Sequence, residues 1–278
     1  MKLSIASAML VLLLVAVAQA EYRPTDPENT VVVQVDDGTI VIELNSRFAP
    51  QTTRQFKRLV RAGFYDRQPF YRVIDGFVAQ GGDGSDMSGE ENDEPTVAAE
   101  FDLEWLEDIP FVAVQKGDMF APETGFVDGF PVARDLDAGK LWIAHCPGIV
   151  GLARGDAADS GSTDFYIVIG QAPRYLERNI TAFGRVVYGM NVVQRIKRGP
   201  AETAGMIESL TDATLIRSAQ VLADIPVAGR LPVTVPDTNS EEFAAMLEAR
   251  RHRTAAWFIN KPPAVLDVCQ VPNQGRVQ

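Results

Sequence analysis

Arg72 and Gln80 are the two side chains that could do chemistry together, if a pair of strands brings them to one surface. Side chains alternate between the faces of a strand, and a short turn through Asp75-Gly76 would set this pair beside the apolar Phe77 and Val78. Arginine stays protonated and presents several donors in a rigid fork, so the groove would offer fixed hydrogen-bond donation next to an apolar surface. An ordinary hairpin with a surface arginine fits the same residues, and the pattern alone favours it.

Nucleophilic and zinc chemistry are excluded by residue spacing. His145 and Cys146 are neighbours on a predicted strand, so their side chains point to opposite faces and cannot form a catalytic pair. The other histidine, His252, lies in a predicted C-terminal helix. The two histidines and two cysteines also lack the paired spacing of a zinc site. We therefore expect no metal and no cofactor.

A long acidic stretch has the composition of a solvated loop. Residues 83–108 hold eleven acidic residues and no Lys or Arg, and a loop or short helix is expected around Trp105. Residues 83–86, DGSD, begin like a calcium loop, but Met87 stands where the third ligand belongs and Ser88 replaces the turn glycine. The sequence therefore favours a solvated acidic loop over a calcium site.

The elements that must position Arg72 and Gln80 begin with a hairpin and a helix. Residues 31–35 and 40–44 alternate on either side of Asp37-Gly38, which predicts two strands joined by a tight turn. Residues 50–62 predict a helix that starts at a proline and stops at a glycine.

Further short strands and one more helix continue the pattern. The strands are expected at 70–74, 77–80, 165–169 and 182–187, and the helix at 191–198. Few helices and many short strands with glycine-rich turns indicate a barrel or sandwich. The regularity ends near Ala223, where prolines are followed by Ser240, a candidate cap for a helix over 241–253.

Four ordered stretches resemble the signatures of cyclophilins, a family of peptidyl-prolyl cis/trans isomerases. Residues 70–83, FYRVIDGFVAQGGD, closely resemble the family form FxR[VI]IxGFxxQGGD. The others are GIVGLAR at 148–154 for GxxxMAR, TDFYI at 163–167 for SQFFI, and FGRVVYGMNVV at 183–193 for the closing strand and helix. The resemblance spans roughly residues 30–222, with a long insertion at 84–147. It implies a mainly β fold, a closed antiparallel β-barrel with capping helices, to which a C-terminal α/β extension is added.

The resemblance also implies a set of site residues. Arg72 takes the place of the catalytic arginine and Gln80 that of the groove glutamine. The remaining matches concern substrate binding: Phe77, Val78, Tyr166, Tyr175 and Leu176 around the proline pocket, and Ala153, Arg154 and Asp164 along the peptide. Three of these positions depart from the usual residue, because Asp164 stands for Gln, Tyr166 for Phe and Val78 for Met. A buried Tyr166 hydroxyl would need a hydrogen-bond partner.

The implied function is peptidyl-prolyl isomerisation that assists folding of exported proteins, with Arg72 stabilising the twisted prolyl amide. Its partners would be proline-containing unfolded or extended polypeptides, and we expect a monomer. The alternative is a binding module or scaffold with the same fold and weak turnover, suggested by the substituted pocket, the acidic insertion and the C-terminal segment.

The N-terminus predicts export. Lys2 precedes an apolar run that ends in Ala18-Gln19-Ala20, so residues 1–20 have the pattern of a signal peptide and are short for a membrane span. The expected division is therefore a signal peptide over residues 1–20, an isomerase domain over 21–222 and an extension over 223–278. The mature protein would be periplasmic or secreted.

Charge and cysteine content fit an exported protein without nucleic-acid or membrane partners. The formal net charge of −11 becomes −12 without Lys2, and a nucleic acid or anionic membrane would require clustered Lys and Arg. Cys146 and Cys269 are the two cysteines. In an oxidising compartment a bridge between them would tie the extension to the main body; two unpaired thiols remain the alternative.

Overall fold

In a computed structural model of the chain, the described residues are 21–85 and 93–277. The predicted signal peptide, residues 1–20, lies outside them, as do Met87 and Ser88 of the rejected calcium loop. Among the described residues, no helix has the length and apolar character needed to span a membrane.

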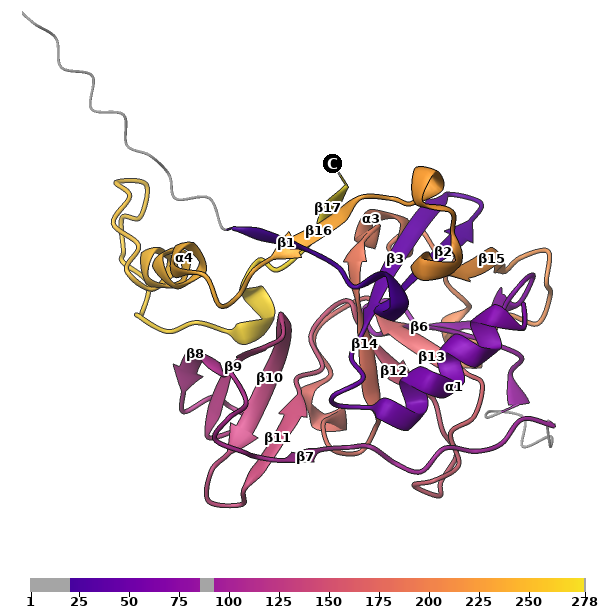
Figure 1. Cartoon of the computed structure of the whole chain (residues 1–278), viewed down its shortest axis with the longest axis horizontal. Coiled ribbons are helices and arrows are strands. Elements are labelled where there is room, and N and C mark those ends of the chain that lie inside the picture. The colour runs from indigo at the N-terminus through magenta and orange to yellow at the C-terminus, as the bar shows by residue number, and fades with distance from the viewer. Residues whose placement is uncertain (1–20, 86–92, 278) are drawn as a thin grey trace, which may run out of the picture.

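The main sheet has nine strands that run antiparallel to their neighbours in the order β4-β15-β2-β3-β14-β12-β13-β6-β5. Its two edge strands are separated in the chain by Tyr71 alone, so the sheet curls into a nearly closed barrel (Figure 1). The mainly β barrel expected from the sequence is confirmed. The strands are β2 (Thr30–Val35), β3 (Gly38–Leu44), β4 (Pro69–Phe70), β5 (Arg72–Val73), β6 (Val78–Gly81), β12 (Ile149–Leu152), β13 (Phe165–Val168), β14 (Ala182–Tyr188) and β15 (Thr214–Val221).

The predicted first hairpin is present as β2 and β3. Val35 pairs with Gly38, and Gly38 has φ +139°, a backbone conformation that glycine adopts without the cost other residues bear. One set of alternating side chains, such as Val33 and Ile42, enters the core inside the barrel. The alternation in the sequence therefore fixes which face of each strand is buried.

Helix α1 (Pro50–Arg61) packs its apolar face, which includes Phe56 and Leu59, against the barrel core. The residue before it, the N-cap Ala49, provides no side-chain cap. The cap comes from the acidic stretch instead, because the Glu100 carboxylate accepts hydrogen bonds from the backbone N–H groups of Gln51 and Thr52 at 2.8 and 2.9 Å. The first turn of the helix thereby gains the acceptors that it lacks locally.

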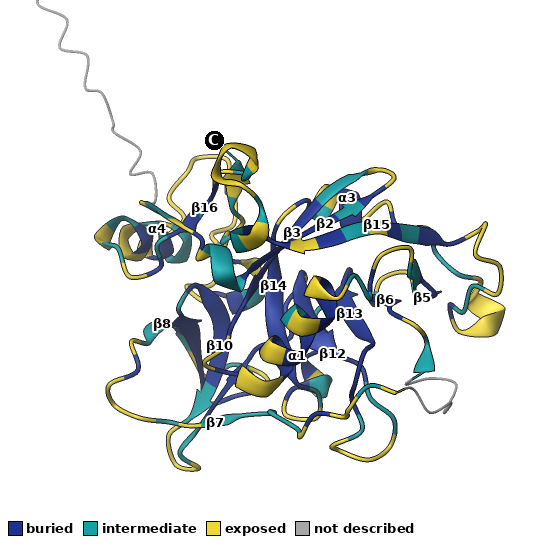
Figure 2. Ribbon diagram, turned by 45° about the vertical axis from the view of Figure 1, so that its right-hand side comes forward, coloured by how far each residue is buried: buried dark blue, intermediate teal, exposed yellow. Residues whose placement is uncertain are grey.

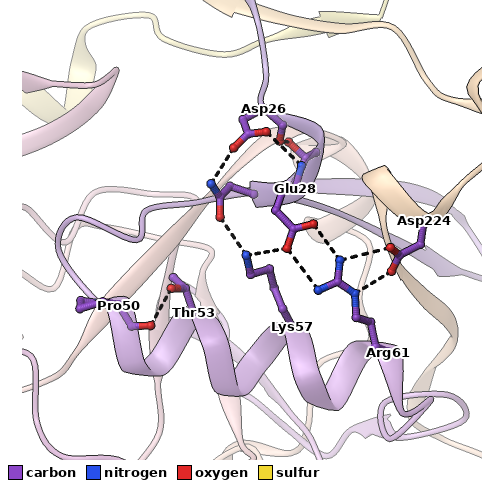
Figure 3. Close-up of polar contacts among 9 residues, drawn as sticks. Asp26, Glu28, Pro50, Thr53, Lys57, Arg61 and Asp224 are labelled. Carbon is purple, nitrogen blue, oxygen red and sulfur yellow. Dashed lines mark hydrogen bonds and ion pairs between the residues drawn. The ribbon is translucent and has the colours of Figure 1, made fainter.

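The solvent side of α1 carries an exposed ion cluster (Figure 3). Arg61 binds Glu28 and Asp224, and Lys57 binds Glu28 and Asn29. These contacts join the helix to the chain before β2 and to the chain after β15.

The second predicted helix is shorter than expected. α3 covers Met190–Val193, whereas the sequence favoured residues 191–198. The last α-helical hydrogen bond runs from Gln194 N to Met190 O. Beyond it each backbone N–H donates to the carbonyl three residues earlier, as from Ile196 N to Val193 O, so the chain continues in tighter turns. Short 3₁₀ turns occur at Pro27–Asn29, Arg174–Leu176, Ala201–Thr203, Leu222–Asp224, Val227–Gly229 and Val268–Gln270.

The insertion forms a second sheet that the sequence did not predict. Its order is β7-β11-β10-β9-β8, from β7 (Leu103–Glu104), β8 (Val112–Lys116), β9 (Glu123–Val127), β10 (Phe130–Asp135) and β11 (Lys140–Ile143). Apolar residues of this sheet, such as Phe126 and Leu141, share a buried cluster with Val78 and Val168 on the outer face of the barrel. Figure 2 shows β10 of this sheet and β12, β13 and β14 of the barrel largely in the colour of buried residues. The expected solvated loop is wrong for four described acidic side chains, which form ion pairs or cap a helix: Glu94, Glu100, Asp102 and Glu104.

The C-terminal extension contains helix and strand, as expected. β16 (Val233–Pro236) pairs with both β1 (Tyr22–Pro24) and β17 (Arg276–Val277). The Ser240 hydroxyl caps α4 (Glu241–Arg251) by accepting from Phe243 N at 3.1 Å. Phe243 and Leu247 of α4 pack into the cluster shared by the insertion and the barrel.

A disulfide joins the insertion end of the barrel to the extension. Cys146 and Cys269 are bonded at a sequence separation of 123, as the sequence hypothesis expected. The extension is thus held to the main body both by packing and by a covalent bond.

Candidate functional site

Three of the expected site residues lie in one row across neighbouring strands. Arg72 of β5 is the pairing partner of Gln80 of β6, and Gln80 is the pairing partner of Tyr166 of β13. Directly opposite residues of an antiparallel pair point to the same face. The Arg72 guanidinium donates from Nη1 to Gln80 Oε1 at 3.1 Å, so the two polar side chains do meet.

The row continues to a glycine that makes room for the tyrosine ring. Gly151 of β12 pairs with Tyr166, and a Cβ at this glycine would lie 2.5 Å from the ring carbon Cζ of Tyr166. No real Cβ tolerates that distance, so a glycine is needed here to make room for the Tyr166 ring beside β12.

The Tyr166 hydroxyl finds its partner in the insertion. It lies 2.7 Å from Nε2 of His145, just beyond the end of β11. Burial raises the pKa of Tyr166, which therefore keeps its proton. Burial, with a smaller contribution from the charge of Arg174, lowers the pKa of His145 to about 4, so the imidazole is neutral near pH 7. This role of His145 was not predicted from the sequence, although a buried Tyr166 hydroxyl was expected to need a hydrogen-bond partner.

A buried ionic cluster positions the segment that carries Tyr175 and Leu176. Glu177, which directly follows them, accepts from Trp142 Nε1 at 2.7 Å and from His145 N at 3.0 Å, and it pairs with Arg174. Residues of the insertion therefore anchor this side of the site. None of these contacts was visible from the local sequence.

The apolar members of the site differ in accessibility. Val78 and Tyr166 are buried beneath the insertion, whereas Phe77 and Leu176 are partly exposed and Tyr175 is 68% exposed. Ile180 is also partly exposed and packs on the same apolar cluster. A ligand can therefore reach Phe77, Leu176 and Ile180, with Tyr175 at the rim.

Three residues expected along the peptide are committed to contacts within the protein. Asp164 is fully buried, and the backbone N–H of Ala153 donates to Asp164 O at 2.9 Å. Arg154 donates to the carbonyl oxygens of Asn179 and Gly155 at 3.0 and 2.7 Å. The structure thus gives Asp164 and Arg154 roles in holding the site together.

The part of the chain that the structure describes contains no candidate metal site. Within residues 21–85 and 93–277, no three His, Cys, Asp or Glu side chains are grouped so that they could hold an ion. The chemistry available is hydrogen bonding by Arg72 and Gln80 beside apolar side chains.

Comparison with known proteins gives a consistent result. Residues 30–221 match the family described as cyclophilin type peptidyl-prolyl cis-trans isomerase/CLD. A protein of Brucella suis biovar 1 named probable peptidyl-prolyl cis-trans isomerase is 31% identical over 207 residues, covering 74% of this chain and 90% of the relative. The peptidyl-prolyl cis-trans isomerase cypE of Dictyostelium discoideum is 28% identical over 171 residues, and the match covers 61% of this chain and 85% of the relative.

A solved structure matches more of the chain than the family region alone. The crystal structure of cyclophilin AquaCyp293 from Hirschia baltica superimposes with a TM-score of 0.75 at 28% identity. The match covers 92% of this chain and 94% of that one, so it extends beyond the barrel into the added segments.

Proposed function

This chain belongs to the cyclophilin-type peptidyl-prolyl cis-trans isomerases, and from that premise we propose that Arg72 is the group that stabilises the twisted prolyl amide. The observation that carries the proposal is the row formed by Arg72, Gln80 and Tyr166 on three adjacent strands. The Arg72 side chain is partly exposed, so a bound peptide can reach it.

The reaction needs a donor that acts on the transition state only. Rotation about an Xaa–Pro bond is opposed by amide resonance, with a barrier of about 20 kcal/mol. Twisting the bond by about 90° breaks the resonance and leaves a lone pair on the prolyl nitrogen. A fixed guanidinium donates to that lone pair only in the twisted state, so its interaction lowers the barrier. A preference of about 7 kcal/mol for the twisted state would give roughly a 10⁵-fold acceleration.

Gln80 and the apolar side chains would hold the two ends of the rotating bond. The Gln80 amide has two N–H donors, of which Tyr71 accepts one, and the other can hold the carbonyl oxygen that precedes the proline. Phe77 and Leu176 would contact the proline ring, over a floor of Val78 and Tyr166.

A binding module with weak turnover is the second candidate, and one observation favours it. Val78 and Tyr166 are buried beneath the insertion and offer little surface to a proline ring. The apolar surface that a ligand can contact is therefore smaller than it would be if these two residues were exposed. Titration with proline peptides followed by NMR separates the two functions, because binding without exchange between cis and trans resonances would favour the module.

The setting of the activity is also part of the proposal. The N-terminal pattern and the Cys146–Cys269 disulfide support a periplasmic or secreted protein that assists folding of exported, proline-containing polypeptides. Fractionation of cells that produce the full chain tests this: the mature form, starting near Glu21, is expected outside the cytoplasm.

Arg72→Ala tests the mechanism. In a protease-coupled assay with a proline peptide, kcat/KM should fall by about 10²–10³-fold, the size seen when one donor to a transition state is removed. Arg217→Ala, which removes an exposed arginine paired with Asp36, is the control and should keep wild-type turnover. Equal turnover in Arg72→Ala and wild type would overturn the role of Arg72.

A further inference from the structure

A continuous chain of hydrogen bonds leads from Arg72 into the protein. Arg72 Nη1 donates to Gln80 Oε1 at 3.1 Å, and Gln80 Nε2 donates to the Tyr71 hydroxyl at 2.6 Å. The Tyr71 hydroxyl donates in turn to Asp164 Oδ2 at 2.9 Å. Of the four side chains only Arg72 is more than slightly exposed, so these hydrogen bonds lead from a partly exposed guanidinium to a fully buried carboxyl group.

The position of Asp164 is fixed by the backbone around it. Gly84 N donates to Oδ1 of Asp164 at 3.0 Å. A Cβ on Gly82 would lie 2.0 Å from the same oxygen, so this glycine leaves space for the carboxyl group. Asp83 also contacts Asp164; burial raises the pKa of Asp83, but the hydrogen bonds that Ser85 and Thr163 donate to its carboxylate contribute to a pKa below its usual value.

Which group donates and which accepts along these hydrogen bonds is fixed at the buried end, by Asp164. Oδ2 of Asp164 accepts from the Tyr71 hydroxyl, which therefore offers its oxygen lone pairs to Gln80. Only the amide nitrogen of Gln80 can donate to those lone pairs, so Nε2 faces Tyr71 and Oε1 faces Arg72. The opposite orientation of the amide would place N–H donors against the guanidinium and remove the hydrogen bond that orients it.

Tyr71 breaks the strand alternation in a way that makes the contact possible. It is the single residue between β4 and β5, outside both strands, and its own carbonyl accepts from Ile207 N at 2.8 Å. The neighbours Tyr71 and Arg72 therefore both reach Gln80, although consecutive strand residues would point apart.

We propose that Tyr71 is a positioning residue of the isomerase: held by Asp164, its hydroxyl fixes the Gln80 amide so that Oε1 orients the Arg72 guanidinium. This inference rests on the proposed role of Arg72 in the reaction. It adds that Arg72 is preorganised by groups that do not touch substrate, and preorganised donors cost no rearrangement when the transition state forms.

Tyr71→Phe removes the hydroxyl and keeps the ring. We expect kcat/KM for a proline peptide to fall about 10-fold, mainly through kcat, because Arg72 and Gln80 remain but are less well aligned. Tyr65→Phe is the matched control. It also removes the hydroxyl of a buried tyrosine, which donates to the carbonyl of Thr163 at 2.8 Å and not to Gln80. Its turnover should stay within about twofold of wild type.

A double-mutant cycle with Gln80→Ala separates positioning from a general structural effect. If Tyr71 acts through Gln80, Tyr71→Phe should cost less than about twofold in the Gln80→Ala background. An equal loss in both backgrounds, or wild-type turnover in Tyr71→Phe, would overturn the inference.

Failure of the proposed function gives a different result. Arg72→Ala measured in the same assay decides that question: full turnover there removes the role of Arg72 itself. Strong loss in Arg72→Ala together with an unchanged Tyr71→Phe removes only the positioning role.

Discussion

Two arginines in this protein each bridge two carboxylates, one inside the molecule and one on its surface. The Arg174 side chain is 5% exposed and that of Arg61 is 41% exposed. The partners come from other parts of the chain in both cases: Asp118 and Glu177 for Arg174, and Glu28 and Asp224 for Arg61 (Figure 3). Each cluster pairs one arginine with one aspartate and one glutamate; the clusters differ in burial, and the surface cluster also includes Lys57.

Burial reverses the effect of the pairing on the carboxylates. It raises the pKa of Glu177 even though Arg174 and Trp142 act in the other direction. At the surface, hydrogen bonds from Arg61 and Lys57 lower the pKa of Glu28 to about 2. The buried cluster forms despite the cost of removing its charges from water. Removing one partner there should therefore lower the free energy of unfolding much more than removing one partner at the surface.

The largest effect is expected for Glu177→Gln. This change keeps the size of the side chain but leaves buried Arg174 with Asp118 as its remaining carboxylate partner, so the free energy of unfolding should fall by about 3 kcal/mol. Chemical denaturation followed by fluorescence measures it. If Glu177→Gln lowers the free energy of unfolding no more than Glu28→Gln does at the surface, burial does not distinguish the two clusters.

The pH dependence of the free energy of unfolding tests the buried region in a second way. The imidazole of His145 stays neutral in the folded protein because its pKa is about 4, whereas in the unfolded chain it binds a proton below about pH 6.5. Stability is therefore lost as pH falls from 6.5 towards 4, by about 2 kcal/mol at pH 5. The difference in unfolding free energy between wild type and His145→Gln, measured from pH 7 to 5, isolates this contribution. A difference that does not change with pH would contradict the buried, neutral imidazole.

The smallest effect is expected at the surface. Glu28→Gln removes one carboxylate from Arg61, but the Glu28 side chain is 46% exposed, so the loss should be less than about 1 kcal/mol. The loss should shrink further in high salt, because mobile ions screen exposed charges. Denaturation of this variant at low and high salt checks both statements, and a loss comparable to that of Glu177→Gln would remove the contrast.

The barrel could be predicted because its signals are local. The alternation of residues 31–35 and 40–44 and the proline and glycine around α1 each depend on neighbours in the sequence. The same holds for residues 70–83, whose spacing places Arg72 opposite Gln80 once the turn forms.

The insertion could not be predicted because its contacts are distant in sequence. Glu100 caps a helix that begins 50 residues earlier, and its acidic neighbours read locally as a solvated loop. His145 was considered only as a partner of Cys146 or as a zinc ligand, whereas its contact is Tyr166 of β13. Such pairings depend on how the insertion packs on the barrel, which composition does not show.

The bond between Cys146 and Cys269 has a consequence for a cut chain. The stretch before Cys269 presents Trp257 and Ile259 at 82% and 94% exposure, which makes it accessible to a protease. A nick beside Lys261 would not release the C-terminal peptide, because its sulfur remains joined to the main fragment. The nicked protein would migrate as one band on a gel without reductant and as two bands once the bond is reduced.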